Sequence, residues 1–254
     1  MPEILITNDD GIDAPGLRAL VDAVKALGSV SVVAPNQERS ASAQSLTLRR
    51  PIYCEQVAER EWAIDGTPAD AMIVAIDKLL GAPPSLVISG INPGANLGEN
   101  VFYSGTVGAA AEATIHHVPA FAISVVHRGE DFDYTQAAQF ARKMAELILS
   151  KGLPESVLLN VNVPQEWNGS VRFTRQSKKV TRNVLEKGVD AQGRTFYWLA
   201  DQQVIEEPDA ESDIAAVLDG AVSVTPLEID RTHGASLAHL SQWAKRLARP
   251  QGTR

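Results

Sequence analysis

Two adjacent carboxylates, Asp9 and Asp10, have the clearest potential for chemistry in this chain. They come directly after the apolar run 4–6, which predicts a short buried strand, and just before an amphipathic helix pattern. In open α/β sheets the carboxyl ends of parallel strands build the ligand sites. Adjacent like charges repel, so the pair needs a proton or a cation, and a divalent cation such as Mg²⁺ prefers oxygen ligands. The alternative is an Asp-rich turn, in which Asn8 and Gly11 are present for turn geometry. Residues 8–11 by themselves favour neither the metal site nor the simple turn.

A polar loop at residues 35–42 follows the second apolar run and offers further ligands. Ser40 and Ser42 carry hydroxyl groups that can bind a metal, and the guanidinium of Arg39 suits phosphate. Serine is also common in turns for backbone reasons alone. Taken by itself, this segment therefore favours an ordinary surface loop.

Residues 89–98 form the most unusual segment, because ten positions hold three glycines and two asparagines. Such a loop lets the backbone approach a ligand and present its N–H groups, and Asn92 can give a carbonyl oxygen to a metal. Soon afterwards, Ser104 and Thr106 open an Ala-rich helix pattern. The N-terminus of a helix can bind an anion. Capping of the helix by Ser104 is the alternative, and the two roles are compatible.

The elements that must position these residues alternate along the first 165 residues or so. Apolar runs predict strands at residues 4–6, 30–34, 85–89, 120–126 and 157–163. Helical patterns lie at residues 15–28, 69–80 and 105–115 and around 137–148. This alternation predicts an α/β fold with a mostly parallel sheet covered by helices on both faces. Short strands between residues 49 and 65 predict an antiparallel excursion.

The sequence changes character after Pro164. Residues 172–184 are locally basic, and residues 193–199 contain three consecutive aromatic side chains. A hairpin that joins these segments across residues 188–190 predicts a long arm for oligomerisation, which pairs its exposed edge with a partner subunit. A ribbon folded onto its own domain is an equally good interpretation.

A strand at residues 219–227 and an amphipathic helix at 235–247 are predicted to close the chain. We therefore expect a core at residues 1–165 and a C-terminal region at 166–254. The arm occupies about residues 172–205 of that region, and both regions belong to one structural unit.

Composition narrows the function further. The net charge of −8 argues against a non-specific nucleic-acid binder, which needs a positive field. No apolar run is long enough to span a bilayer, and the first residues show no basic-then-apolar export signal, so a cytoplasmic location is expected. The single cysteine, Cys54, excludes an intramolecular disulfide. Neither the P-loop pattern nor G-x-G-x-x-G after the first strand is present.

Eight stretches together resemble the survival protein SurE family of metal-dependent nucleotidases and phosphatases. In order from residue 4 to about residue 227 they are ILITNDDGIDAPG, VVAPNQERSAS, DGTPADA, VISGINPGANLG, YSGTVGAAAEA, NVNVP, RFTRQS and GAVSVTPL. Each is weak alone, but eight in order are specific. The resemblance implies a Rossmann-like core, a C-terminal arm exchanged between subunits, and homodimers or homotetramers.

The resemblance also implies the site residues. Metal ligands fall on Asp9, Asp10, Ser40 and Asn92, all of them residues that the strand-end loops had already nominated. The phosphate-recognition region falls on Asn96, Ser104 and Thr106, which join the two aspartates as implied catalytic residues. The implied activity is hydrolysis of nucleoside 5′- and 3′-monophosphates, and in some members of short polyphosphate, with one Mg²⁺ or Mn²⁺ per subunit.

The resulting hypothesis is phosphomonoester hydrolysis by a metal-activated water, with Asn96, Ser104 and Thr106 stabilising charge on the transferring group. In a second hypothesis one aspartate is a covalent nucleophile. Enzymes of that kind usually separate the nucleophile from the acid by one residue, whereas Asp9 and Asp10 are adjacent. A third hypothesis is an oligomeric module that binds metal or nucleotide without catalysis.

Overall fold

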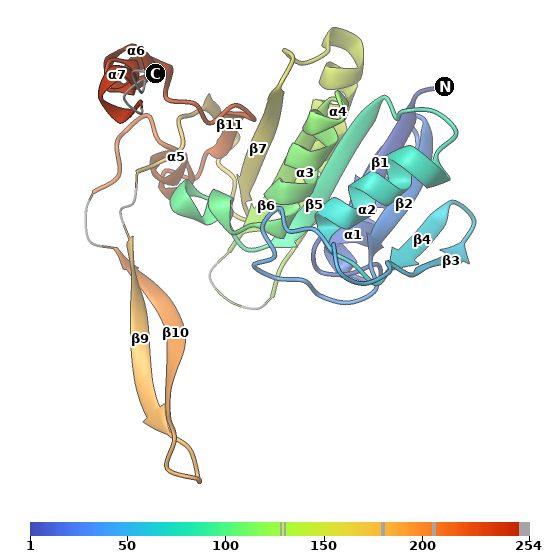
Figure 1. Cartoon of the computed structure of the whole chain (residues 1–254). Coiled ribbons are helices and arrows are strands. Elements are labelled where there is room, and N and C mark those ends of the chain that lie inside the picture. The colour runs from blue at the N-terminus through green and yellow to red at the C-terminus, as the bar shows by residue number, and fades with distance from the viewer. Residues whose placement is uncertain (128, 130, 179–180, 205–206, 249–254) are drawn as a thin grey trace, which may run out of the picture.

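The computed structural model describes residues 1–127, 129, 131–178, 181–204 and 207–248 (Figure 1). Within them, the main sheet contains β1 (Glu3–Thr7), β2 (Ser29–Pro35), β3 (Cys54–Ala58), β4 (Glu61–Ile64), β5 (Leu86–Pro93), β6 (Ala120–Val126), β7 (Val157–Pro164), β8 (Val171–Phe173) and β11 (Val222–Glu228). The spatial order is β3-β4-β2-β1-β5-β6-β7-β11-β8. Pairing is parallel from β4 to β7, whereas β3 and β11 pair antiparallel with β4 and β7. The predicted mostly parallel sheet and its antiparallel excursion are therefore confirmed.

Helices cover both faces of this sheet: α1 (Pro15–Val24), α2 (Pro68–Val74), α3 (Gly105–Ile115) and α4 (Thr135–Lys151). Ile4 and Ile6 of β1 share a core with α1 and α4. Leu5 faces the opposite way and shares a core with α2 and α3, on the side from which Figure 1 views the sheet. Successive side chains of a strand point to opposite faces, so a strand covered on both sides is apolar throughout. This is why β1 shows no polar alternation.

Two helices depart from the prediction in their C-terminal halves. α1 stops at Val24 rather than at Gly28. Gly28 lies against Pro2 instead, and a Cβ there would come within 2.2 Å of the Pro2 carbonyl oxygen. α2 is followed by a π-helical turn, Ala75–Leu79, so the predicted helix at 69–80 changes its winding midway.

The predicted hairpin arm is confirmed as the antiparallel pair β9 (Thr181–Val189) and β10 (Thr195–Val204). Figure 1 shows this ribbon projecting away from the main sheet. Its turn lies at residues 190–194, not at the predicted 188–190. Gly193 has a φ of +80° in this turn, a conformation that glycine adopts without strain.

The arm is shorter than the predicted range 172–205. Val171–Phe173 belongs to the main sheet, because it pairs in parallel with β11. Residues 179–180 and 205 of the predicted range lie outside the described residues. A helix that was not predicted, α5 (Asp213–Leu218), precedes β11, which therefore starts at Val222 rather than at residue 219.

The predicted closing helix at 235–247 is two helices, α6 (Gly234–Ser241) and α7 (Ala244–Leu247). The chain tightens between them, where the Gln242 and Trp243 amides bond to carbonyls three residues back. None of the helices in the described part of the chain is both long enough and apolar enough to cross a membrane.

Candidate functional site

The four segments singled out from the sequence converge at the carboxyl edge of the sheet. The loops after β1, β2 and β5 and the N-terminus of α3 line a cavity of about 390 Å³. The lining includes six of the seven predicted site residues: Asp9, Asp10, Ser40, Asn92, Asn96 and Ser104. The seventh, Thr106, is buried and reaches Asp9. The loops meet because the carboxyl ends of parallel strands share one edge.

Asp9 is buried and held from α3. The Thr106 hydroxyl donates a hydrogen bond of 2.6 Å to Asp9 Oδ1. A Cβ at Gly105 would come within 2.8 Å of Asp9 Oδ2, so glycine permits this close approach. Burial raises the pKa of Asp9, and the hydrogen bond from Thr106 opposes that shift. Thr106 therefore orients Asp9 and favours its charged form.

Asp10 lines the cavity with a carboxylate that the protein does not satisfy. Its Oδ2 atom is buried and has no hydrogen-bond partner among the described residues. Burial, together with the charges of Asp9 and Glu38, raises the pKa of Asp10 to about 7. A proton or a cation stabilises such a group, and Mg²⁺ and Mn²⁺ take carboxylate, hydroxyl and amide oxygens. The orphaned oxygen thus fits a divalent cation in this cavity.

Ser40 and Asn92 offer neutral oxygens to the same cavity. The Ser40 hydroxyl donates to Glu38 Oε1 at 2.5 Å, and the Asn92 amide nitrogen donates to the Gly94 carbonyl at 2.7 Å. The amide oxygen of Asn92 is therefore the atom that it can offer to a cation. In the described part of the chain, no three or more His, Cys, Asp or Glu side chains are placed to hold a metal. Sequence reasoning missed Glu38, although it stands two residues before Ser40.

Asn96 is held from the sheet below it. Its backbone N–H donates to Asn162 Oδ1 at 2.9 Å, and its carbonyl accepts from Asn160 Nδ2 at 2.7 Å and from Asn162 Nδ2 at 3.1 Å. Its side-chain nitrogen donates to Ser124 Oγ at 2.9 Å. Sequence reasoning assigned no role to Asn160 and Asn162. The available signal was two asparagines, spaced by two, in a strand that is otherwise apolar.

Arg39 and Ser42, the other polar candidates of the loop after β2, are not part of the cavity lining. Arg39 Nη2 donates to Asp65 Oδ1 at 2.9 Å, so the guanidinium pairs with a carboxylate. The loop turns sharply, since Ala41 and Ala43 both have positive φ angles. These turns direct neighbouring side chains to different surroundings, which their spacing in sequence does not reveal.

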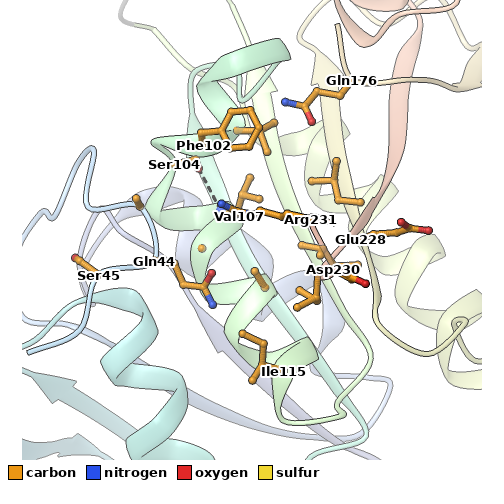
Figure 2. Close-up of a pocket in the computed structure, with 17 residues that line it drawn as sticks. Gln44, Ser45, Phe102, Ser104, Val107, Ile115, Gln176, Glu228, Asp230 and Arg231 are labelled. Carbon is orange, nitrogen blue, oxygen red and sulfur yellow. Dashed lines mark hydrogen bonds between the residues drawn. The ribbon is translucent and has the colours of Figure 1, made fainter. Parts of the chain in front are cut away.

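A groove of about 620 Å³ runs along α3 (Figure 2). Ser104 lines both this groove and the cavity of Asp9, so the two meet at the start of α3. Its hydroxyl accepts a hydrogen bond of 3.1 Å from the Val107 N–H, which caps the helix. Capping and a position beside the cavity therefore coexist at Ser104. In the groove, the Arg231 guanidinium lies 5.5 Å from the centroid of the Phe102 ring.

Comparisons with known proteins agree on one family. The sequence model described as "Survival protein SurE" matches residues 4–183. A protein of Geotalea daltonii named "5'-nucleotidase SurE" is 45% identical over 244 residues, covering 95% of this chain and 98% of the relative. A protein of Geobacter sulfurreducens with the same name is 42% identical over 252 residues, covering 98% and 96%.

Among solved structures, the "Crystal Structure of Sure Protein from Aquifex aeolicus" superposes with a TM-score of 0.87 at 37% sequence identity. The superposition covers 96% of this chain and all of that one. The similarity thus includes the C-terminal region as well as the core.

Proposed function

The chain belongs to the survival protein SurE family, and on that premise we propose that it hydrolyses nucleoside monophosphates at the cavity of Asp9 and Asp10. It is a phosphoric monoester hydrolase, as the names of its relatives indicate. The observation that carries the choice of site is the orphaned, buried oxygen of Asp10 beside a second carboxylate. Among the described residues that line the cavity there is no basic side chain to offset this pair, so the cavity suits a positive ligand.

We propose that one divalent cation, Mg²⁺ or Mn²⁺, binds to Asp9, Asp10, Ser40 and Asn92. When bound, such a cation polarises phosphoryl oxygens and acidifies a coordinated water. The two carboxylates supply the charge that holds it, and Thr106 keeps Asp9 oriented. Asn92 is neutral, so it adds no further negative charge to a cavity that already holds Asp9, Asp10 and Glu38, which suits a dianionic phosphate.

The substrate phosphate is proposed to lie against Asn96, Ser104 and the first turn of α3. The Val107 and Gly108 amides at this helix start already bond to Ser104, and those of Gly105 and Thr106 bond to Asp9. The proposal therefore rests on donors held in place, which stabilise charge that develops in the transition state. Asn96 meets this requirement because the ends of β6 and β7 fix both its backbone and its side chain. These contacts recognise phosphate rather than the base, so we extend the proposal to 3′-monophosphates and, as a side activity, to short polyphosphate.

Release of phosphate from AMP, measured with and without Mn²⁺, tests the proposal. We expect release that requires the metal. If AMP and Mn²⁺ bind without release, the chain is instead a binding module. If phosphate becomes covalently attached to Asp9 or Asp10 during turnover, the covalent route replaces hydrolysis by water.

Tyr103 is expected to contact the nucleobase, because it lines the cavity and is 61% exposed. Stacking of a base on an aromatic ring contributes about 1–3 kcal/mol, so Tyr103→Ala is expected to raise the KM for AMP roughly tenfold. The KM for ribose 5-phosphate, which has no base, is expected to change little. Steady-state kinetics with both substrates provide the measurement.

The neighbouring residue supplies the matched control for this prediction. Phe102 is 53% exposed but lines the groove along α3 instead of the cavity. Phe102→Ala should therefore leave the KM for AMP near the wild-type value. Equal effects of the two substitutions, or an equal change for both substrates in Tyr103→Ala, would show that Tyr103 does not recognise the base.

We propose that the chain forms homodimers or homotetramers through the β9–β10 arm. Exposed ribbon edges and exposed aromatic side chains are typical of subunit contacts, and on this arm Trp198 and Leu199 are 67% and 71% exposed. Replacing both by Ser is expected to lower the mass measured by light scattering. Tyr53→Ser, a control at a position that is 69% exposed on the main body, should leave the mass unchanged. Identical masses for all three proteins would exclude this role of the arm.

A further inference from the structure

Asp213, at the start of α5, is a fully buried carboxylate outside the cavity. It accepts three backbone hydrogen bonds: from Gly98 N at 2.9 Å to Oδ2, and from Ser177 N at 3.0 Å and Ile214 N at 2.8 Å to Oδ1. A buried charge is costly unless hydrogen bonds compensate it. Burial accordingly raises the pKa of Asp213, and these backbone donors oppose the shift. The carboxylate joins segments that are 115 and 36 residues away in sequence.

One of the joined segments is the loop of the candidate site. Gly98 stands two residues after Asn96, and its φ is +54°. Asp213 holds the Gly98 N–H, and Gln176 Nε2 donates to the Gly98 carbonyl at 2.8 Å. Asn162 in turn holds the Asn96 backbone. The loop is therefore fixed at two nearby points, one from the sheet and one from the C-terminal region.

The other joined segment is the root of the β9–β10 arm. In sequence the arm is inserted between Ser177 and Asp213. An isolated parallel β-bridge closes this insertion: Arg175 N donates to the Glu211 carbonyl at 3.0 Å, and Asp213 N donates to the Arg175 carbonyl at 2.9 Å. The hydrogen bond from Ser177 to the Asp213 side chain completes the closure. Asp213 thus touches the root of the arm and the loop of the site at once.

We propose that Asp213 is a positioning residue that couples the root of the arm to the phosphate-binding side of the catalytic cavity. By fixing Gly98, it holds Asn96 where the substrate phosphate is bound. Networks of hydrogen bonds are one physical route by which two sites can be coupled. The kinetic part of this proposal rests on the proposed function, whereas the structural part does not.

The test compares Asp213→Asn with Asp219→Asn in the full-length chain. Asparagine keeps the shape of Asp213 but has only one side-chain oxygen. When that oxygen accepts from the Ser177 and Ile214 amides, the side-chain nitrogen faces the Gly98 N–H and cannot accept a hydrogen bond from it. Asp219 is a matched control beside the same helix, since it is exposed and pairs with Arg172. Gln176→Ala is a milder variant, because it removes the bond to the Gly98 carbonyl and leaves the bond from the Gly98 N–H to Asp213 in place.

Two readouts are measured: hydrogen–deuterium exchange of the peptide covering residues 94–103, and kinetics with AMP. In Asp213→Asn we expect exchange of that peptide to be about tenfold faster, with kcat lower by about tenfold and KM within about twofold. Gln176→Ala should show the same local change at smaller size, and Asp219→Asn neither change. Peptides from β1 and β5 should exchange at the wild-type rate in all variants.

Unchanged exchange at residues 94–103 in Asp213→Asn would overturn the proposal, whatever the activity. Equally faster exchange in the peptides of β1 and β5 would also overturn it, because Asp213 would then only support overall stability. If wild-type protein released no phosphate, the proposed function would fail, and the exchange data would still decide whether Asp213 holds the loop.

Discussion

Asp9→Asn is expected to abolish metal-dependent release of phosphate, lowering kcat/KM for AMP by roughly 10³-fold. The substitution removes one of the two charges that are proposed to hold the cation. It keeps the shape of the side chain and an oxygen that can accept the hydrogen bond from Thr106. Phosphate release from AMP with and without Mn²⁺ provides the measurement. Near-normal, metal-dependent turnover in this variant would show that Asp9 is not needed to bind the metal or to catalyse the reaction.

A loss of activity in Asp9→Asn is expected to occur without loss of the fold. Burial places the folded-state pKa of Asp9 above its unfolded value of 3.8. Such a carboxyl lowers the free energy of unfolding as the pH rises from the unfolded-state pKa through the folded-state pKa, because the charged form is disfavoured in the folded protein. The neutral amide of asparagine avoids this cost, so the variant should keep the melting temperature at neutral pH. Asp13→Asn is the matched control, because Asp13 is exposed in the same loop. It should retain both turnover and the melting temperature.

Stabilisation by Mn²⁺ is expected to depend on pH through Asp10, whose folded-state pKa is about 7. Below that value the metal must displace a proton from Asp10, so apparent affinity should weaken by about tenfold for each pH unit. The increase in melting temperature caused by a fixed Mn²⁺ concentration should therefore be large at about pH 8 and small at about pH 5.5. Differential scanning fluorimetry across this range provides the measurement.

The metal-free protein should show the opposite trend. The folded-state pKa of Asp10, about 7, lies above its unfolded value of 3.8. The contribution of Asp10 to stability is therefore greatest below pH 3.8 and is lost as the pH rises to about 7. Asp10→Asn should remove this trend and most of the stabilisation by Mn²⁺. An equal Mn²⁺ effect at both ends of the pH range in the wild-type chain would show that Asp10 does not bind the metal.

The elements around the site were predictable because each leaves a local pattern. The apolar run at residues 120–126 has the bounds of β6, and the pattern at 105–115 has those of α3. The wrong predictions of element bounds lie where contacts between residues far apart in sequence decide the local structure. α5 spans six residues, which is too short for a helical period to stand out, and its first residue is fixed by contacts with Gly98 and Ser177.

The convergence of the candidate residues could also be predicted, since parallel strands share a carboxyl edge. Their individual surroundings could not. Glu38 shares the cavity with Asp10, whereas Arg39, the next residue, turns to Asp65. Thr106, expected beside phosphate, donates a hydrogen bond to Asp9, which its place in the sequence does not reveal. A loop encodes these differences in backbone angles that residue types specify weakly.

By itself, the sequence determined the alternation of strands and helices in the core, the mostly parallel sheet, and the four loops that carry oxygen ligands, because hydrophobic period and turn residues are local properties. Only the tertiary structure decided which of those oxygens is left without a partner, what raises the pKa of Asp10, and that Asp213 reaches a glycine 115 residues away. The physical reason is that desolvation and hydrogen-bond satisfaction depend on every group packed around an atom. Most of those groups are distant along the chain.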